Sequence, residues 1–254
     1  MKLYAFTCGS VTAAFRGEEH GEVRVPVPSY LIEHEQGRVL VDTGLHPGVR
    51  DDPHARIGWV ADRMRLELPA GEDIASRLSA IGVEPGSLRY LVNTHLHFDH
   101  AGGNELIPDE IELVVQAREW KAGHDEREIE ANVYNPLDYG QPRPVLAVKG
   151  QHDLFGDGTV VLLPTPGHTP GHQSIRLRLD GADAVICADA CYFSDWMDSE
   201  ETPPYGFDKR QEVESVRRLR ALRDAGAWMI YGHDADQWAA VPQAPRAVVM
   251  PAVA

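Results

Sequence analysis

The feature that most restricts this chain is a cluster of four potential metal ligands within six residues. Residues 95–100 read His-Leu-His-Phe-Asp-His and lie between an apolar run and a glycine-containing turn. Because side chains alternate along an extended strand, His95 and His97 are predicted to point to the same face. The turn that follows lets Asp99 and His100 approach from a second direction. Imidazole nitrogen and carboxylate oxygen suit zinc and similar metals, so this spacing favours a metal site over a run of surface histidines.

Three later segments offer ligands of the same kind, each after an apolar run. The segment Thr165–His172 reads TPGHTPGH and presents His168 on a loop that glycine and proline make rigid. Asp189 follows the run Ala184–Cys187, where a carboxylate is costly unless it is paired or bound to a metal. His233 follows the last predicted strand.

Seven candidate ligands result: His95, His97, Asp99, His100, His168, Asp189 and His233. Seven side chains are too many for one tetrahedral ion, but they suit two ions that share a carboxylate. The sequence therefore predicts a dinuclear site. His172 is an alternative ligand to His168, although we expect it to orient its loop. Asp42 is expected to support the ligands or form a turn rather than to bind metal.

Short apolar and β-branched runs bounded by turn residues predict eight strands. They are Val25–Glu33, Arg38–Val41, Tyr90–Asn93, Ile111–Gln116, Thr159–Leu163, Gln173–Leu179, Ala184–Cys187 and Ala227–Tyr231. Helical periodicity predicts helices over Glu72–Ala80 and Asp208–Ala225, which indicates an α/β layer protein. Each half has a strand that runs into a histidine-containing loop, so two similar halves are expected to share one site. The polar segment Gly123–Gly156 is expected to be a long surface excursion.

Composition excludes several classes of protein. Of the 254 residues, 43% are hydrophobic and 25% are charged, which is typical of a globular chain and not of a disordered or fibrous one. The formal charge of −15 has the wrong sign for a nucleic-acid partner, and the chain lacks the long apolar run of a membrane span.

Three cysteines and an N-terminus without a secretory pattern favour a reducing, cytoplasmic location. The sequence leaves open whether the chain is a monomer or a homodimer.

The ligand segments, in their order and spacing, resemble the metallo-β-lactamase superfamily. Residues 41–44, Val-Asp-Thr-Gly, are also similar to an early motif of that superfamily, and the resemblance extends from about Tyr30 to Trp238. It implies an αββα sandwich, taken as a single domain over residues 1–254, with the metals at one edge of the two sheets. It also implies that one ion takes His95, His97 and His168, that the other takes Asp99, His100 and His233, and that Asp189 bridges them.

A narrower resemblance is to the quorum-quenching N-acyl homoserine lactone lactonases. Residues 95–104, 165–174, 189–192 and 206–208 carry it. In that family a tyrosine three residues after the bridging aspartate faces the substrate, which corresponds to Tyr192. Together with apolar candidates for a pocket, this predicts substrate contacts from Phe98, Tyr192, Tyr205, Gly206 and Phe207. Residues 12–25, where the family places part of its acyl-chain pocket, depart from the pattern because they are rich in charge and glycine.

The resemblance implies a hydrolase that opens the N-acyl homoserine lactone ring with two Zn²⁺ per chain, Fe, Mn or Co being alternatives. Two such ions can activate a water molecule and polarise the carbonyl. Asp99 and Tyr192 are the expected catalytic residues: Asp99 would move a proton to the leaving oxygen, and Tyr192 would donate a hydrogen bond to the carbonyl. Alternatives are a lactonase for another lactone such as 4-pyridoxolactone, a glyoxalase II-like thioesterase, or a metal-binding module without activity.

Overall fold

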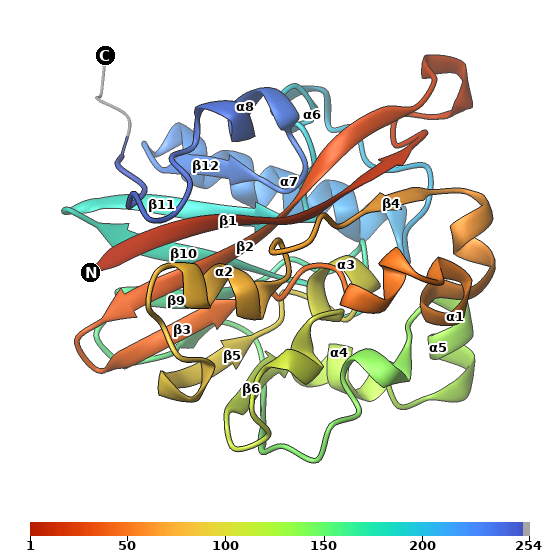
Figure 1. The fold of residues 1–254 in the computed structure, drawn as a ribbon. Helices are drawn as coiled ribbons and strands as arrows, with labels where there is room; N and C mark the ends of the chain where they lie inside the picture. The colour runs from red at the N-terminus through yellow and green to blue at the C-terminus, as the bar shows by residue number, and fades with distance from the viewer. Residues whose placement is uncertain (251–254) are drawn as a thin grey trace.

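The computed structural model describes residues 1–250, and two β-sheets form its centre (Figure 1). The first has the order β4-β1-β2-β3-β5-β6-β7, with strands β1 (Lys2–Ala13), β2 (Val23–His34), β3 (Gly37–Val41), β4 (Arg65–Glu67), β5 (Leu88–Val92), β6 (Glu112–Gln116) and β7 (Val145–Val148). The second has the order β12-β11-β10-β9-β8, with β8 (His152–Asp153), β9 (Val160–Pro164), β10 (Gln173–Leu179), β11 (Ala182–Ala188) and β12 (Trp228–Tyr231). The expected single domain over residues 1–254 thus includes four residues outside the described range.

Helices and 3₁₀ segments lie in several of the connections between these strands. The α-helices of residues 1–250 are α1 (Pro53–Ile57), α2 (Ile74–Ala80), α3 (Phe98–Ala101), α4 (Ala117–Ala122), α5 (Glu126–Ala131), α6 (Trp196–Ser199), α7 (Lys209–Asp224) and α8 (Ala235–Ala240). The 3₁₀ segments are η1 (Glu18–His20), η2 (Pro47–Arg50), η3 (Gly58–Asp62), η4 (Pro85–Ser87), η5 (Asn104–Leu106) and η6 (Pro136–Asp138). In this described part of the chain, no helix has the length and apolar character required to cross a bilayer.

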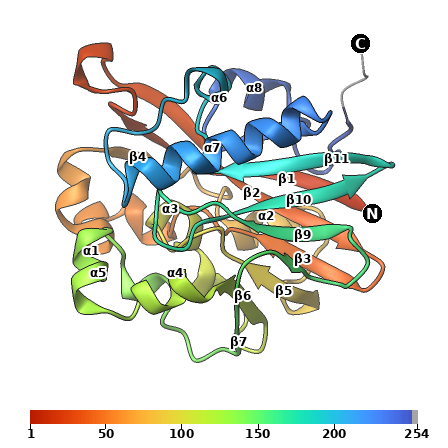
Figure 2. The ribbon, with the colours of Figure 1, turned by 180° about the vertical axis from the view of Figure 1, so that it is seen from behind.

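The two sheets pack face to face, and helices cover their outer sides (Figure 2). Ile32 of β2 and Ile175 of β10 belong to the same buried cluster, which lies between the sheets. Leu78 of α2 belongs to a second cluster with side chains from the opposite face of the first sheet. Leu219 of α7 belongs to a third, with side chains from the opposite face of β11 and β12. This layer order confirms the predicted αββα sandwich.

All eight predicted strands are present, with ends within two residues of the predicted ones. The predicted helices correspond to α2 and α7, and the side chain of Asp208 caps α7 by accepting hydrogen bonds from the N–H groups of Arg210 and Gln211. The pattern missed β1, β4, β7 and β8. Strand β1 is interrupted by a bulge between Thr7 and Ser10, where Gly9 has a φ of 108°, so its alternation is broken.

The expectation that Gly123–Gly156 is only a surface excursion is wrong. This segment contains α5, and its strand β7 pairs with β6 at the edge of the first sheet. The side chains of Tyr134 and Tyr139 are buried, and the hydroxyl of Tyr139 donates a hydrogen bond to the carbonyl of Gly123. The sequence did not predict this packing because the segment is mostly polar, and only a few aromatic and apolar side chains anchor it.

The topology places several strand ends at one edge of the sandwich. Strands β3 and β5 are parallel neighbours, as are β11 and β12, and β9 runs in the same direction as β11 because both are antiparallel to β10. The loops that follow β5, β9, β11 and β12 carry the predicted ligands. Segments from both halves of the chain therefore meet at one place.

Candidate metal centre

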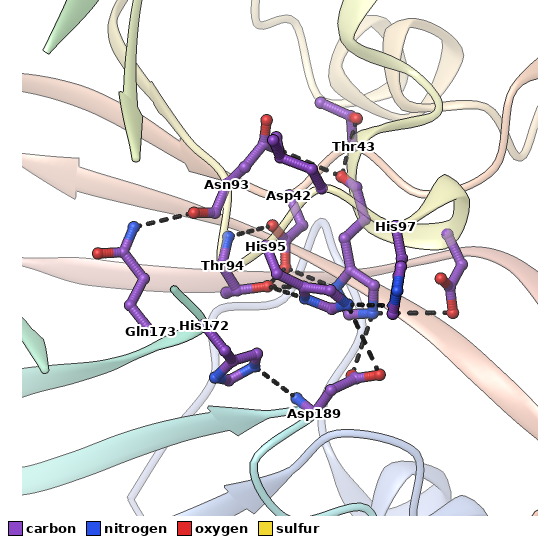
Figure 3. Close-up of polar contacts among 12 residues, drawn as sticks. Asp42, Thr43, Asn93, Thr94, His95, His97, His172, Gln173 and Asp189 are labelled. Carbon is purple, nitrogen blue, oxygen red and sulfur yellow. Dashed lines mark hydrogen bonds and ion pairs between the residues drawn. The ribbon is translucent and has the colours of Figure 1, made fainter. Parts of the chain in front are cut away.

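The seven candidate ligands come together at this edge. They form three overlapping groups, in each of which the donor atoms lie within 4.8 Å of one another: His95, His97 and His168; His95, His100 and Asp189; and Asp99, His100 and His233. Figure 3 shows His95 and His97 on one side of the site and Asp189 on the other. The structure thus brings together all the residues predicted as ligands.

The first group consists of three histidines. The Nδ1 atom of His97 lies 3.0 Å from Nε2 of His95 and 3.0 Å from Nε2 of His168. His97 donates a hydrogen bond from Nε2 to the carbonyl oxygen of Asn132 at 2.8 Å, which leaves Nδ1 free to face the site. Burial lowers the pKa of all three imidazoles, so they are held in the neutral form that binds metal ions.

The second group lies on the other side of Asp189. The Nε2 atoms of His100 and His233 lie 3.7 and 3.8 Å from Oδ2 of Asp99. His233 donates a hydrogen bond from Nδ1 to the carbonyl oxygen of Pro26 at 2.8 Å. This bond directs the Nε2 atom of His233 toward the site.

Asp189 connects the two groups through its two carboxylate oxygens. Its Oδ1 atom lies 3.0 Å from Nε2 of His100 and 3.2 Å from Nε2 of His233. Its Oδ2 atom lies 3.3 Å from Nε2 of His168 and 3.9 Å from Nε2 of His95. One oxygen therefore faces each group, which is the geometry of a bridging ligand.

The buried atoms of the site fit a pair of divalent cations. Nε2 of His100 and Oδ1 of Asp189 are buried, and neither makes a hydrogen bond. A tetrahedral ion with bonds of about 2.0–2.1 Å separates its ligand nitrogens by roughly 3.3 Å, close to the spacing in the first group. Burial lowers the pKa of His100, but the carboxylates of Asp189, Asp99 and Asp42 outweigh burial and raise it well above its ordinary value. The site therefore has a negative field that cations would neutralise.

Asp42 supports the cluster from the side away from Asp189, as Figure 3 shows. Its Oδ2 atom accepts hydrogen bonds from Nδ1 of His100 at 2.9 Å and from the hydroxyl of Thr94 at 2.8 Å. Its Oδ1 atom accepts from the backbone N–H of Thr94 at 2.8 Å. With a φ of 56°, Asp42 adopts the left-handed conformation that aspartate tolerates better than most residues. Asp42 thus orients a candidate ligand and does not belong to the ligand groups.

His172 has a supporting place as well. Its Nε2 atom accepts a hydrogen bond from the backbone N–H of Asp189 at 3.1 Å, and its Nδ1 atom lies 3.1 Å from the carbonyl oxygen of Thr165. Burial lowers its pKa to about 3, so the ring is neutral. Both ring nitrogens are engaged outside the ligand groups, and the ring links the loop after β9 to the loop that carries Asp189.

Glu119 is a functional candidate that the sequence reasoning missed. Its carboxylate is fully buried and accepts four hydrogen bonds, from the N–H of Leu96 at 3.1 Å, the hydroxyl of Tyr134 at 2.7 Å, the hydroxyl of Thr169 at 2.9 Å and the N–H of Gly171 at 2.7 Å. It therefore connects the two loops that carry the first group of histidines. A lone glutamate in a helical first turn gives no sequence signal that distinguishes it from an ordinary dipole-stabilising residue.

A cavity of about 660 Å³ opens onto the ligands. All five predicted substrate-contacting residues line it, namely Phe98, Tyr192, Tyr205, Gly206 and Phe207. The remaining wall is mainly apolar and includes Phe15, Trp59, Met64 and Val133, with Glu18 and Arg63 among its few charged residues. The predicted contacts therefore share one cavity with the candidate metal centre, and a mainly apolar wall suits an aliphatic ligand.

Tyr192 is held rigidly at this cavity. Its side chain is buried, its ring stacks on Trp196 with 5.7 Å between centroids, and it lies edge-on to His233 at 4.8 Å. Burial, followed by the negative charge of Asp189, raises its pKa well above the ordinary value. The phenol therefore stays neutral and can donate a hydrogen bond.

Comparison with known proteins gives consistent matches over most of the chain. A family model described as the metallo-beta-lactamase superfamily matches residues 23–233. The N-acyl homoserine lactonase AttM of Azorhizobium caulinodans is 31% identical over 96% of this chain and 97% of its own length, and AiiA of Bacillus thuringiensis subsp. kurstaki is 32% identical over 85% and 84%. A solved N-acyl homoserine lactone hydrolase, with N-hexanoyl-L-homoserine bound at its catalytic metal center, superposes with a TM-score of 0.85 at 28% identity, covering 97% of this chain and 98% of that one.

Proposed function

Because this chain belongs to the metallo-β-lactamase superfamily, we propose that it is a metal-dependent lactonase that hydrolyses the ester bond of the N-acyl homoserine lactone ring and so quenches quorum sensing. The relatives named N-acyl homoserine lactonase support this substrate. The observation that carries the proposal is the position of Asp189, which turns one oxygen to each histidine group on the floor of an apolar cavity.

We assign two divalent cations to the site, most simply Zn²⁺, with Fe, Mn or Co as compatible substitutes. The first would bind His95, His97 and His168, the second would bind Asp99, His100 and His233, and Asp189 would be shared. When bound, such a pair supplies Lewis acidity and lowers the pKa of a water molecule toward neutrality. The nitrogen and oxygen donor set and the unpartnered buried atoms of His100 and Asp189 support this assignment.

Tyr192 is the proposed donor to the carbonyl oxygen of the lactone. Its hydroxyl stays protonated because burial and the charge of Asp189 raise its pKa. The packing of its ring against Trp196 and His233 fixes the direction of the phenol before the substrate binds. A fixed donor to a developing oxyanion contributes about 2.7–4 kcal/mol to catalysis in comparable sites.

Asp99 is the proposed proton carrier. Both Asp99 and Asp189 line the cavity, but the side chain of Asp99 is 12% exposed, whereas that of Asp189 is 2% exposed and is surrounded by histidines. Of these two acids, Asp99 is therefore the more accessible to a water molecule and to the substrate. It would take a proton as the water attacks and deliver it to the ring oxygen as the ester bond breaks.

The remaining parts of the proposal concern where and in what form the protein acts. Cys8, Cys187 and Cys191 are buried thiols without disulfides, which is consistent with a reducing, cytoplasmic environment. We expect a monomer or a homodimer that acts on a small lactone, without nucleic acid or membrane as a partner.

A panel of substrates tests the proposed function. Zn²⁺-reconstituted protein should open N-acyl homoserine lactones in a pH-stat assay, which measures the acid released by ring opening. The panel should include 4-pyridoxolactone and a glutathione thioester, because each represents another hydrolase of this fold. Cleavage of the thioester without opening of any homoserine lactone would contradict the proposal.

A further inference from the structure

Val133 has a backbone conformation that a β-branched residue rarely adopts. Its φ is 56°, in the left-handed region, where the branched side chain crowds the backbone. The other non-glycine residues with positive φ in the described part of the chain are Asp42, Asp180, Ala188 and Glu200. Of these five residues, Val133 is therefore the least suited to a left-handed conformation. The presence of valine at this position requires an explanation.

The strain arises from the way α5 ends. The N–H of Tyr134 donates to the carbonyl of Ile129 at 3.0 Å, and the N–H of Val133 donates to the carbonyl of Glu130 at 3.3 Å. These two bonds form a Schellman motif, in which the residue at the position of Val133 is usually glycine. A glycine would make the same hydrogen bonds without strain, so the helix end itself does not require valine.

The same turn reaches the metal centre through the preceding residue. Asn132 accepts the hydrogen bond from Nε2 of His97 through its backbone carbonyl, and its side chain donates to the carbonyl of Glu128 at 2.8 Å. The helix end thus orients a candidate ligand. That function depends on the backbone of Asn132, and it too would persist with glycine at position 133.

What glycine could not supply is a side chain in the cavity. Val133 is half-buried, and it lines the cavity that also contains Tyr192 and the ligand His97. We propose that Val133 is a specificity-determining residue, retained in a strained conformation because its isopropyl group forms part of the wall that contacts the acyl group of the substrate. This inference rests on the proposed lactonase function.

Two substitutions separate strain from substrate contact. V133G removes both the strain and the contribution of this side chain to the wall, whereas V133A keeps a Cβ, and with it part of the strain, while shortening the side chain. D180G is the matched control, because Asp180 also has a positive φ, of 48°, but is exposed in the turn between β10 and β11. The measurements are urea unfolding of the Zn²⁺-saturated proteins, zinc content, and kcat and KM for homoserine lactones with acyl chains of increasing length.

We expect V133G to unfold at a higher urea concentration than the wild type and to keep its zinc content. Its KM for long-chain substrates should rise severalfold, while kcat and the kinetics for the shortest acyl chain change less than twofold. V133A should show the same loss for long chains with a smaller gain in urea resistance than V133G, and D180G should leave the kinetics unchanged.

Two results would overturn the inference. A V133G protein that is no more resistant to urea than the wild type would refute the strain, and an equal loss for short and long acyl chains would refute the substrate contact. A wild-type protein that opens no lactone would instead refute the proposed function. The urea comparison would still decide whether the helix end is strained, so the two failures can be distinguished.

Discussion

Asp189 can remain ionised in the protein interior because positive and polar groups surround it. Burial raises its pKa, but the neighbouring His100 and His233 outweigh burial and hold the pKa well below its ordinary value. No arginine or lysine approaches this carboxylate in the described residues, so its partners are imidazoles. A carboxylate in such surroundings is a candidate functional group rather than one member of a stabilising ion pair.

The Tyr192→Phe substitution tests catalysis at the scale of one atom. It removes the hydroxyl and keeps the ring that packs on Trp196, so zinc content and stability should change little. The value of kcat should fall by roughly 10²-fold, because a donor to the oxyanion is lost. Tyr4→Phe, at a half-buried tyrosine whose hydroxyl donates to Glu33 outside the site, is the control and should retain full activity. An unchanged kcat in Y192F would exclude the proposed role.

The site residues that the sequence could predict are those that lie in recognisable motifs. The spacing of His95, His97 and His100 predicts that their side chains lie close together, because the three residues are near one another in the chain and follow one strand. Two supporting residues, Asp42 and His172, were also predicted, because they lie in recognisable motifs, whereas the turn after α5 could not be predicted. Every residue type has a backbone carbonyl, so the sequence does not distinguish Asn132 as a hydrogen-bond acceptor. The φ of Val133 depends on how α5 ends, which the sequence does not show either.

At the scale of elements, the loop after β9 is held against the start of α4. A Cβ atom on Gly171 would lie 2.1 Å from the backbone nitrogen of Glu119, so only glycine allows the loop to approach this closely. The carboxylate of Glu119 then binds the N–H groups of Gly171 and Leu96, one from each ligand-bearing loop. The relative position of His97 and His168 depends on this contact.

The Glu119→Gln substitution should loosen that contact. Each oxygen of Glu119 accepts one backbone N–H, so the amide of glutamine must leave one buried N–H without an acceptor. The free energy of unfolding should fall by about 1–3 kcal/mol, and zinc affinity should fall by about 10–100-fold, as measured by urea unfolding and competition with a chelator. Glu130→Gln, on the exposed side of α5, is the matched control. Equal zinc affinity in E119Q and the wild type would contradict the positioning role.

Elements differed in how well the sequence predicted them, and burial pattern explains the difference. Strand β6 (ELVVQ) has a short apolar run, and β10 (QSIRLRL) alternates apolar and polar residues, so both patterns were visible. Strand β7 has only four residues at the edge of the sheet, and it follows a proline-rich segment that suggested an exposed loop. Strand β1 carries the bulge at Gly9, which breaks the alternation that a strand prediction needs.

In the whole molecule, the candidate metal centre lies where the two sheets meet, because its side chains come from both. His95, His97, Asp99 and His100 follow the first sheet, whereas His168, Asp189 and His233 follow strands of the second. The sandwich architecture was predictable from the resemblance to a known superfamily, but the order of the strands required the structure. Because each sheet supplies part of the ligand set, bound cations should also stabilise the pairing of the sheets.

In the proposed site, these seven side chains hold two cations around Asp189. Metal analysis of purified protein that has been saturated with Zn²⁺ and then dialysed tests this proposal. The wild type should retain two zinc ions per chain, Asp189→Asn should retain one or fewer, and Asp236→Asn, an exposed carboxylate on α8, should retain two. A wild-type protein that retains no more than one zinc ion, or a D189N protein that retains two, would contradict the account.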